Sequence, residues 1–146
     1  REWPVYLLTR NPYARMVSYY HYVTQTPFRK LNPVLRYVRS FASCEQFLSE
    51  AEFHALREAA MKRKNGALEP CAHYAKVDGE YHNGVVPISA EHMDVWAAKY
   101  FGLDGVPVVN ASDHRDWEIY YNERRRERVR EYMAEDFYHF GYGGDD

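Results

Sequence analysis

The segment that most constrains the fold is a short apolar run that leads into Arg10 and then at once into Asn11-Pro12. Residues 5–8, Val-Tyr-Leu-Leu, are typical of a buried β-strand. Asn11 is a preferred N-cap and Pro12 suits the first helical position, so a helix should begin directly behind the strand and run to about Thr24. A strand followed at once by a helix indicates an α/β layer fold with parallel strands.

The rest of the chain alternates helical patterns with few strands. A second strand is expected over Val85–Ile88 and a short extended piece over 106–109. Further helices are expected to begin at a capping box at Ser43, to run from a second capping box at Ser49 to about Lys64, and to span Ser89–Phe101 and Asn122–Ala134. Two clear strands make a thin sheet, so partner strands are expected to be missing from this chain.

Length and composition fit one globular domain. The chain has 146 residues, of which 46% are hydrophobic and 27% charged, and this excludes a disordered, collagen-like or coiled-coil chain. No apolar run approaches the roughly 20 residues that span a bilayer, and a formal net charge of -2 argues against general nucleic-acid binding. Neither the spacing of Cys44 and Cys71 nor that of the histidines fits a metal site, so none is predicted. The two thiols are expected to be buried and free, or one incidental pair.

Side chains around the strand–helix junction form a candidate phosphate site. Arg10 stands at the carboxyl end of the strand, where ligands bind in open α/β sheets. Asn11, Arg15 and Ser18 recur at i, i+4 and i+7, and so share one helix face. Free N–H groups at the helix start favour an anion, to which Arg10 would add a bidentate pair. In the alternative interpretation, Arg10 pairs with a carboxylate and Ser18 faces solvent.

This segment resembles the 3′-phosphate-binding motif of the sulfotransferases that use 3′-phosphoadenosine 5′-phosphosulfate (PAPS). That motif is a strand, then Arg-[Asn/Asp]-Pro, then a helix with Ser eight residues after the Arg, often followed by Tyr-Tyr-His, as at 19–21 here. Four later segments are similar to family segments in the same order: 43–48, 86–93, 106–112 and 132–142. The resemblance implies that Arg10 and Ser18 bind the 3′-phosphate of PAPS, or of its product adenosine 3′,5′-bisphosphate (PAP). Asn11 and Arg15 are cofactor-binding candidates from their helix face alone.

The resemblance also implies a P-loop-NTPase-like parallel sheet flanked by helices, and sulfuryl transfer from PAPS to a hydroxyl or amine acceptor. The family has a further strand and a P-loop-like turn that holds the 5′-phosphosulfate through a Lys. The only G-x-x-x-x-G here, residues 79–84, is followed by Val85-Val86 where Lys-Ser/Thr is required, so we interpret it as a turn or loop. Since the chain also lacks an initiating Met, residues 1–146 are interpreted as one partial domain, incomplete at the N-terminus. The catalytic base and the P-loop Lys are expected upstream. The alternative is a non-catalytic remnant or interaction module that keeps the fold.

Residues 27–84 are expected to form a helical and loop region on the acceptor side. His21, His73 and His82 are candidates for acceptor contact, and the alternative is that they are surface or packed histidines. The acceptor would be a hydroxyl-bearing molecule such as a carbohydrate. A polar cluster further along either caps a turn or lies near cofactor or acceptor; it consists of Asn110, Ser112, His114 and Arg115.

Residues 123–131 carry five Arg interleaved with three Glu. We interpret them as a solvated helix face, with a nucleic-acid- or phosphopeptide-binding module as the weaker alternative. Glu91 and Asp136 are expected to be structural. No signal peptide is visible, so the expected compartment is the cytoplasm, or the Golgi lumen if an upstream anchor has been removed.

Overall fold

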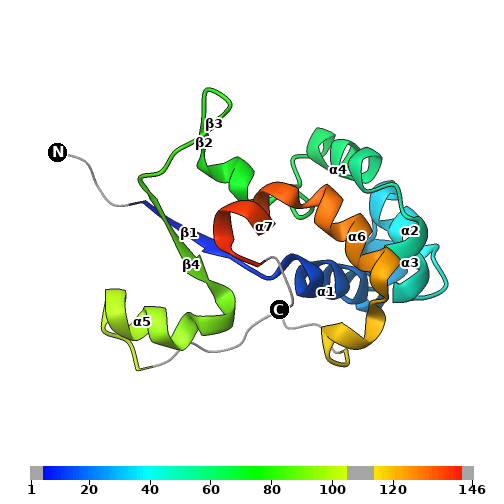
Figure 1. Cartoon of the computed structure of the whole chain (residues 1–146). Helices are drawn as coiled ribbons and strands as arrows, with labels where there is room; N and C mark the ends of the chain where they lie inside the picture. The colour runs from blue at the N-terminus through cyan, green and yellow to red at the C-terminus, as the bar shows by residue number, and fades with distance from the viewer. Residues whose placement is uncertain (1–4, 105–113, 143–146) are drawn as a thin grey trace.

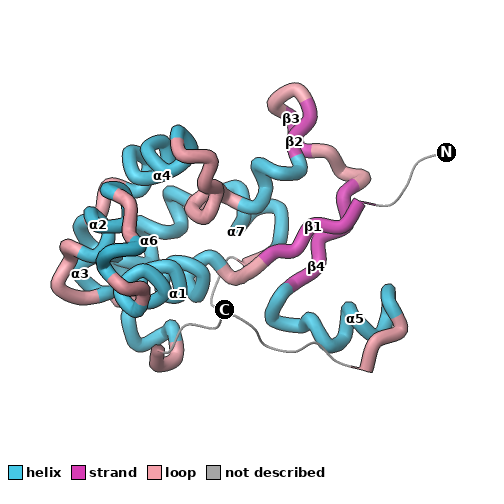
Figure 2. Tube along the Cα trace, turned by 180° about the vertical axis from the view of Figure 1, so that it is seen from behind, coloured by secondary structure: helices cyan, strands magenta, loops and turns pink. Residues whose placement is uncertain are grey.

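A group of helices lies on one side of the molecule and a thin sheet on the other (Figure 1; seen from behind in Figure 2). The computed structural model describes residues 5–104 and 114–142, so the extended piece expected at 106–109, Asn110 and Ser112 lie outside the described residues. The α-helices are α1 (Pro12–Gln25), α2 (Pro33–Arg39), α3 (Cys44–Glu50), α4 (Phe53–Lys62), α5 (Met93–Phe101), α6 (Glu123–Tyr132) and α7 (Ala134–Phe140). The 3-10 turns are η1 (Phe28–Lys30), η2 (Cys71–Ala75), η3 (Ala90–His92) and η4 (Trp117–Tyr120).

The core is helical and is built around α1. As expected, Asn11 caps this helix and Met16, Tyr20 and Val23 form its buried stripe. α1 packs against α2, α3, α6 and η4, and the central side chain from α3 is the fully buried Phe47. None of the described helices is long and apolar enough to cross a membrane.

The mixed α/β character is confirmed, and the main sheet is small. β1 (Val5–Thr9) pairs in parallel with β4 (Val85–Ser89), as expected, while β2 (Lys76–Val77) and β3 (Glu80–Tyr81) form a separate antiparallel hairpin. Residues 79–84 hold the end of the hairpin turn, strand β3 and a second turn at Asn83-Gly84 that leads into β4, so this segment is not a phosphate-binding helix start.

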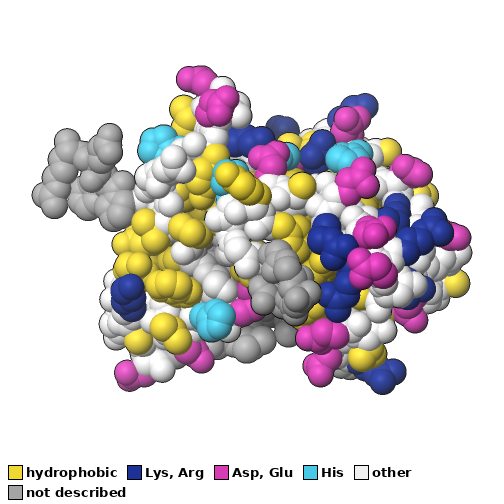
Figure 3. Space-filling view, in the orientation of Figure 1, with side chains coloured by type: hydrophobic (Ala, Val, Ile, Leu, Met, Phe, Trp, Pro, Cys, Tyr) yellow, Lys and Arg dark blue, Asp and Glu magenta, His cyan; other side chains and the backbone are white. Residues whose placement is uncertain are grey.

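The expectation that residues 5–8 are buried is wrong. Val5 is 57% exposed and Leu8 is 54% exposed, because among the described strands only β4 pairs with β1. α5 covers part of the sheet, where Tyr6 packs against Tyr100 and Phe101. Figure 3 shows hydrophobic side chains gathered on this side of the molecule. An apolar run predicts a strand, but its burial depends on neighbours that the run does not specify.

Two helix boundaries also differ from expectation. Ser49 does not start a helix: it lies inside α3, where its hydroxyl accepts a hydrogen bond from Arg125 (2.8 Å), and α4 begins without a side-chain cap. The helix expected over Asn122–Ala134 is α6, which Asn122 caps and which ends at Tyr132; a further helix that was not expected, α7, follows Met133. Residues 69–84, at the end of the expected helical and loop region 27–84, contain η2 and the hairpin.

The interpretation of 123–131 as a solvated face is wrong for three of its five arginines. Arg128 donates to the last carbonyls of α3, and Arg126 stacks over aromatic rings. Arg125 donates to Ser49 Oγ of α3. Arg130, whose side chain is 36% exposed, pairs with Glu123 of the same helix (2.8 Å) and also donates to Tyr13 OH (3.3 Å). A planar guanidinium on a long apolar stem can satisfy helix-end carbonyls and cover rings at once. Arg125, Arg126 and Arg128 thus hold α6 to its neighbours.

Candidate anion-binding site

The two parallel strands end side by side at Thr9 and Ser89, and α1 begins three residues after Thr9. Arg10 lies in the short connection, at the carboxyl end of the sheet (Figure 1). In open α/β folds, this edge is where ligands bind.

Arg10 and Ser18 lie together, and a histidine joins them. Arg10 Nη2 donates to Ser18 Oγ (2.8 Å), and Ser18 Oγ lies 3.1 Å from His114 Nε2. We call these three residues the strand-end site. No ion pair of the described residues includes Arg10, so the alternative of a carboxylate-paired Arg10 is not what the structure shows there. Arg10 is exposed as a residue, but the protein around its guanidinium partly desolvates it and lowers its pKa, and the nearby Glu91 carboxylate opposes this.

The expectation of free N–H groups at the start of α1 is wrong. Asn11 Oδ1 accepts from Tyr13 N (2.9 Å) and Ala14 N (3.5 Å). Asn11 N itself donates to Glu91 Oε2 (3.0 Å), and Pro12 has no N–H. The backbone N–H and the side-chain oxygen of Asn11 are therefore engaged, so these N–H groups at the start of α1 do not hold an anion at the strand-end site.

Glu91 belongs to a polar network beside the site, as a structural residue in the way the sequence suggested. Its Oε1 accepts from Tyr142 OH (2.7 Å) and from Ser89 Oγ (2.9 Å). Tyr142 OH also lies 3.1 Å from Thr9 Oγ1. Burial raises the pKa of Tyr142 to about 12, so the phenol keeps its proton. Sequence reasoning missed Tyr142, although it closes the last segment of the resemblance.

Arg15 turns away from the strand-end site. Its Nη2 donates to the Ala67 carbonyl (2.6 Å), and its Nη1 lies 3.7 Å from Cys71 Sγ and 3.9 Å from a carboxylate oxygen of Asp136. Sharing a helix face with Ser18 therefore did not bring Arg15 to the strand-end site. Its side chain instead binds the segment before η2. Cys71 and Cys44 are both free thiols.

Of the three candidate histidines, only His21 lies beside the strand-end site. His21 Nδ1 donates to the Val17 carbonyl (2.9 Å), and its ring centroid lies 5.1 Å from those of His114 and Tyr120. His82 caps a local turn, accepting from Gly84 N (3.1 Å). The sequence named His114 only as one member of a polar cluster that either caps a turn or lies near the cofactor, and its contact with Ser18 places it at the strand-end site.

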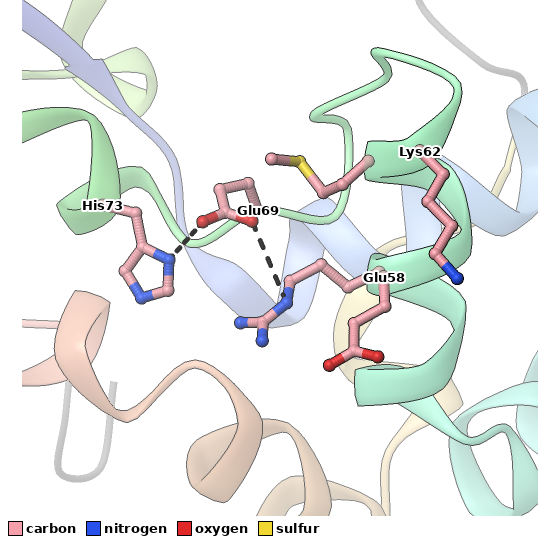
Figure 4. A pocket seen from close by; sticks show the side chains of 6 residues that line it. Glu58, Lys62, Glu69 and His73 are labelled. Atoms are coloured by element: carbon pink, nitrogen blue, oxygen red, sulfur yellow. Dashed lines mark hydrogen bonds and ion pairs between the residues drawn. The ribbon is translucent and has the colours of Figure 1, made fainter.

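His73 lies in a different cluster, at a surface pocket of about 380 Å³ within residues 27–84. Its Nδ1 contacts Glu69, and its Nε2 lies 3.0 Å from Glu135 Oε1. In Figure 4, dashed lines join Glu69 to His73 and to the guanidinium of Arg57. No group of His, Cys, Asp and Glu within the described ranges could hold a metal ion.

Glu135 makes this cluster pH-sensitive. Burial acts to raise the pKa of Glu135, but hydrogen bonds from Lys76 (3.0 Å) and His73 outweigh it and lower the pKa. The stabilisation is therefore complete above the unfolded pKa of about 4.3 and is lost as the pH falls through the folded value. The side chain is 40% exposed, so we expect Glu135→Gln to cost about 1 kcal/mol or less at pH 5.

Urea unfolding from pH 3 to pH 6 measures this effect. The difference between wild type and Glu135→Gln should vanish toward the acid end, while the exposed Glu127→Gln should show no such trend. A difference that stays constant over this range would contradict the assignment.

Comparison with protein-family models, with curated proteins and with solved structures finds no match to this chain.

Proposed function

We propose that this chain is a PAPS-dependent sulfotransferase domain of P-loop-NTPase-like fold, in which Arg10 and Ser18 hold the 3′-phosphate of the cofactor. The observation that carries the proposal is the 2.8 Å hydrogen bond between these two side chains. They come from a strand end and from the second turn of α1, and they are the two residues to which the sequence resemblance gives the 3′-phosphate.

The chemistry of the strand-end site fits a phosphate. A guanidinium offers five donors in a planar fork, and only one is engaged with Ser18 in the described contacts. A hydroxyl and an imidazole lie next to it. When bound, PAPS supplies the sulfuryl group; Arg10 and Ser18 would anchor and orient it, which a transfer reaction needs for in-line placement. They would perform no proton transfer, and the catalytic base stays unassigned.

Titration calorimetry of this chain with PAP and with adenosine 5′-monophosphate tests the proposal. The two nucleotides differ only in the 3′-phosphate. Hydrogen bonds to a charged group contribute about 1.5–3 kcal/mol, so PAP should bind roughly 10- to 150-fold more tightly. Equal affinities would contradict a 3′-phosphate site. Tight PAP binding without sulfuryl transfer from PAPS to any hydroxyl acceptor would favour the interaction-module alternative.

A further inference from the structure

We propose that His114 is the third anion-binding group of the strand-end site, and that an anion bound by Arg10 and Ser18 recruits one proton to the His114 ring. For PAP as the anion, this inference rests on the proposed function; for a simple inorganic anion it does not.

The hydrogen-bond directions around His114 are fixed by chemistry. His114 Nδ1 lies 2.6 Å from the carbonyl oxygen of Arg115. A carbonyl can only accept, so Nδ1 carries a hydrogen. In the neutral ring, Nε2 then has a lone pair, and the contact of 3.1 Å with Ser18 Oγ requires the serine hydroxyl to donate. Ser18 has no second hydrogen, so its lone pair takes the hydrogen bond from Arg10.

An anion changes these requirements. Phosphate and sulfate oxygens accept hydrogen bonds, so Ser18 must turn its hydroxyl hydrogen to the anion in order to bind it. A neutral His114 would then present a lone pair to the lone pairs of Ser18. Protonation of Nε2 restores the contact, because His114 then donates to Ser18 and Ser18 donates to the anion. It also places a second positive charge beside that of Arg10.

The surroundings of His114 supply no competing negative charge in the contacts of the described residues. The groups that face it are Arg10 through Ser18 and the ring of His21 from α1 at 5.1 Å. Tyr120 from η4 lies against His21 (5.1 Å) and accepts from Arg115 N (3.3 Å). His21 donates its Nδ1–H to the Val17 carbonyl and so directs no Nδ1 hydrogen bond to His114. No ion pair among residues 5–104 and 114–142 includes His114, so a bound anion would be its first charged partner there.

The test is calorimetry with PAP near pH 7.5 in two buffers of different ionisation enthalpy, which counts the protons taken up on binding. Because the phosphate itself titrates near pH 6, the decisive quantity is wild type minus His114→Gln. The Gln amide can accept from or donate to Ser18 without changing charge. Wild type should take up as much as one proton more, and its affinity should fall up to about tenfold more per pH unit. His54→Gln, an exposed site on α4, is the matched control and should retain the uptake.

Sodium sulfate is the second probe, because it does not titrate between pH 6 and pH 8. Its affinity for wild type should fall with rising pH, and the His114 ring should change from the Nδ1–H form to the doubly protonated form in long-range ¹H–¹⁵N spectra. That readout needs no variant. PAP binding with equal proton uptake in wild type and His114→Gln would overturn this inference and leave the proposed function standing. Sulfate-linked protonation without PAP binding would do the reverse. Binding of neither probe would overturn both.

Discussion

Replacing Arg10 by alanine should weaken the binding of PAP by roughly 10- to 150-fold, because hydrogen bonds to a charged group contribute about 1.5–3 kcal/mol. The fold should be little affected, because the residue is exposed and, among the described contacts, its side chain loses one hydrogen bond, to Ser18. Calorimetry measures the affinity, and thermal unfolding checks that the protein stays folded.

Two further variants separate charge from geometry. Arg10→Lys keeps the positive charge and loses the planar fork, so it should recover only part of the affinity. Arg124→Ala removes one positive charge from an exposed position of α6 and should leave the affinity unchanged. If Arg10→Ala binds PAP as tightly as Arg124→Ala does, Arg10 does not hold the 3′-phosphate.

Asp136→Ala should be the most destabilising of the substitutions considered, by about 3–5 kcal/mol. Asp136 is fully buried. Its two oxygens accept from Cys71 N (2.8 Å) and Ala72 N (2.7 Å), and Arg15 lies 3.9 Å away. Alanine would leave two backbone donors unsatisfied and the guanidinium without its carboxylate. Chemical denaturation against the exposed Glu127→Ala gives the comparison, and a loss below about 1 kcal/mol would refute the role.

The pH dependence of this effect has a defined sign. Burial raises the pKa of Asp136, and the two N–H groups and Arg15 only partly oppose it. The carboxyl proton of Asp136 is therefore bound more tightly in the folded protein than in the unfolded chain. Its contribution to stability is fully present below the unfolded pKa of about 3.9 and is lost as the pH rises through the folded value. Denaturation curves give the free energy of unfolding of wild type minus that of Asp136→Asn, which cannot ionise. This difference should fall as the pH rises from about 3.9 through the folded pKa of Asp136.

The parts of the fold that could be predicted are those with a local cause. Asn11-Pro12 fixed the start of α1, and Ser43 caps α3 by accepting from Gln46 N. The strands β1 and β4 could be predicted because a short apolar run bounded by turn residues is typical of a strand. Helical spacing predicted only that Ser18 lies on the same face of α1 as Asn11; the resemblance paired it with Arg10, and the two side chains do meet.

The parts that could not be predicted depend on contacts between distant segments. Nothing local distinguishes Arg15, which reaches the segment before η2, from Arg10, which reaches Ser18. Likewise, Ser49 matches a capping pattern but is used as an acceptor for Arg125, 76 positions away. Long, flexible polar side chains choose partners by tertiary packing, and a periodicity argument gives only the side of the helix from which they start.

The exposed position of β1 has a mechanical consequence for the strand-end site. The main buried cluster contains side chains of α1, including Met16 and Val17, but none from β1 or β4. Ser18 thus belongs to the well-packed helical half, and Arg10 extends from the weakly covered sheet. An anion gripped by both would act as a cross-link between the two halves. Anion binding would then stabilise the packing of the sheet against the helices, and firmer packing of the sheet would in turn raise the affinity for the anion.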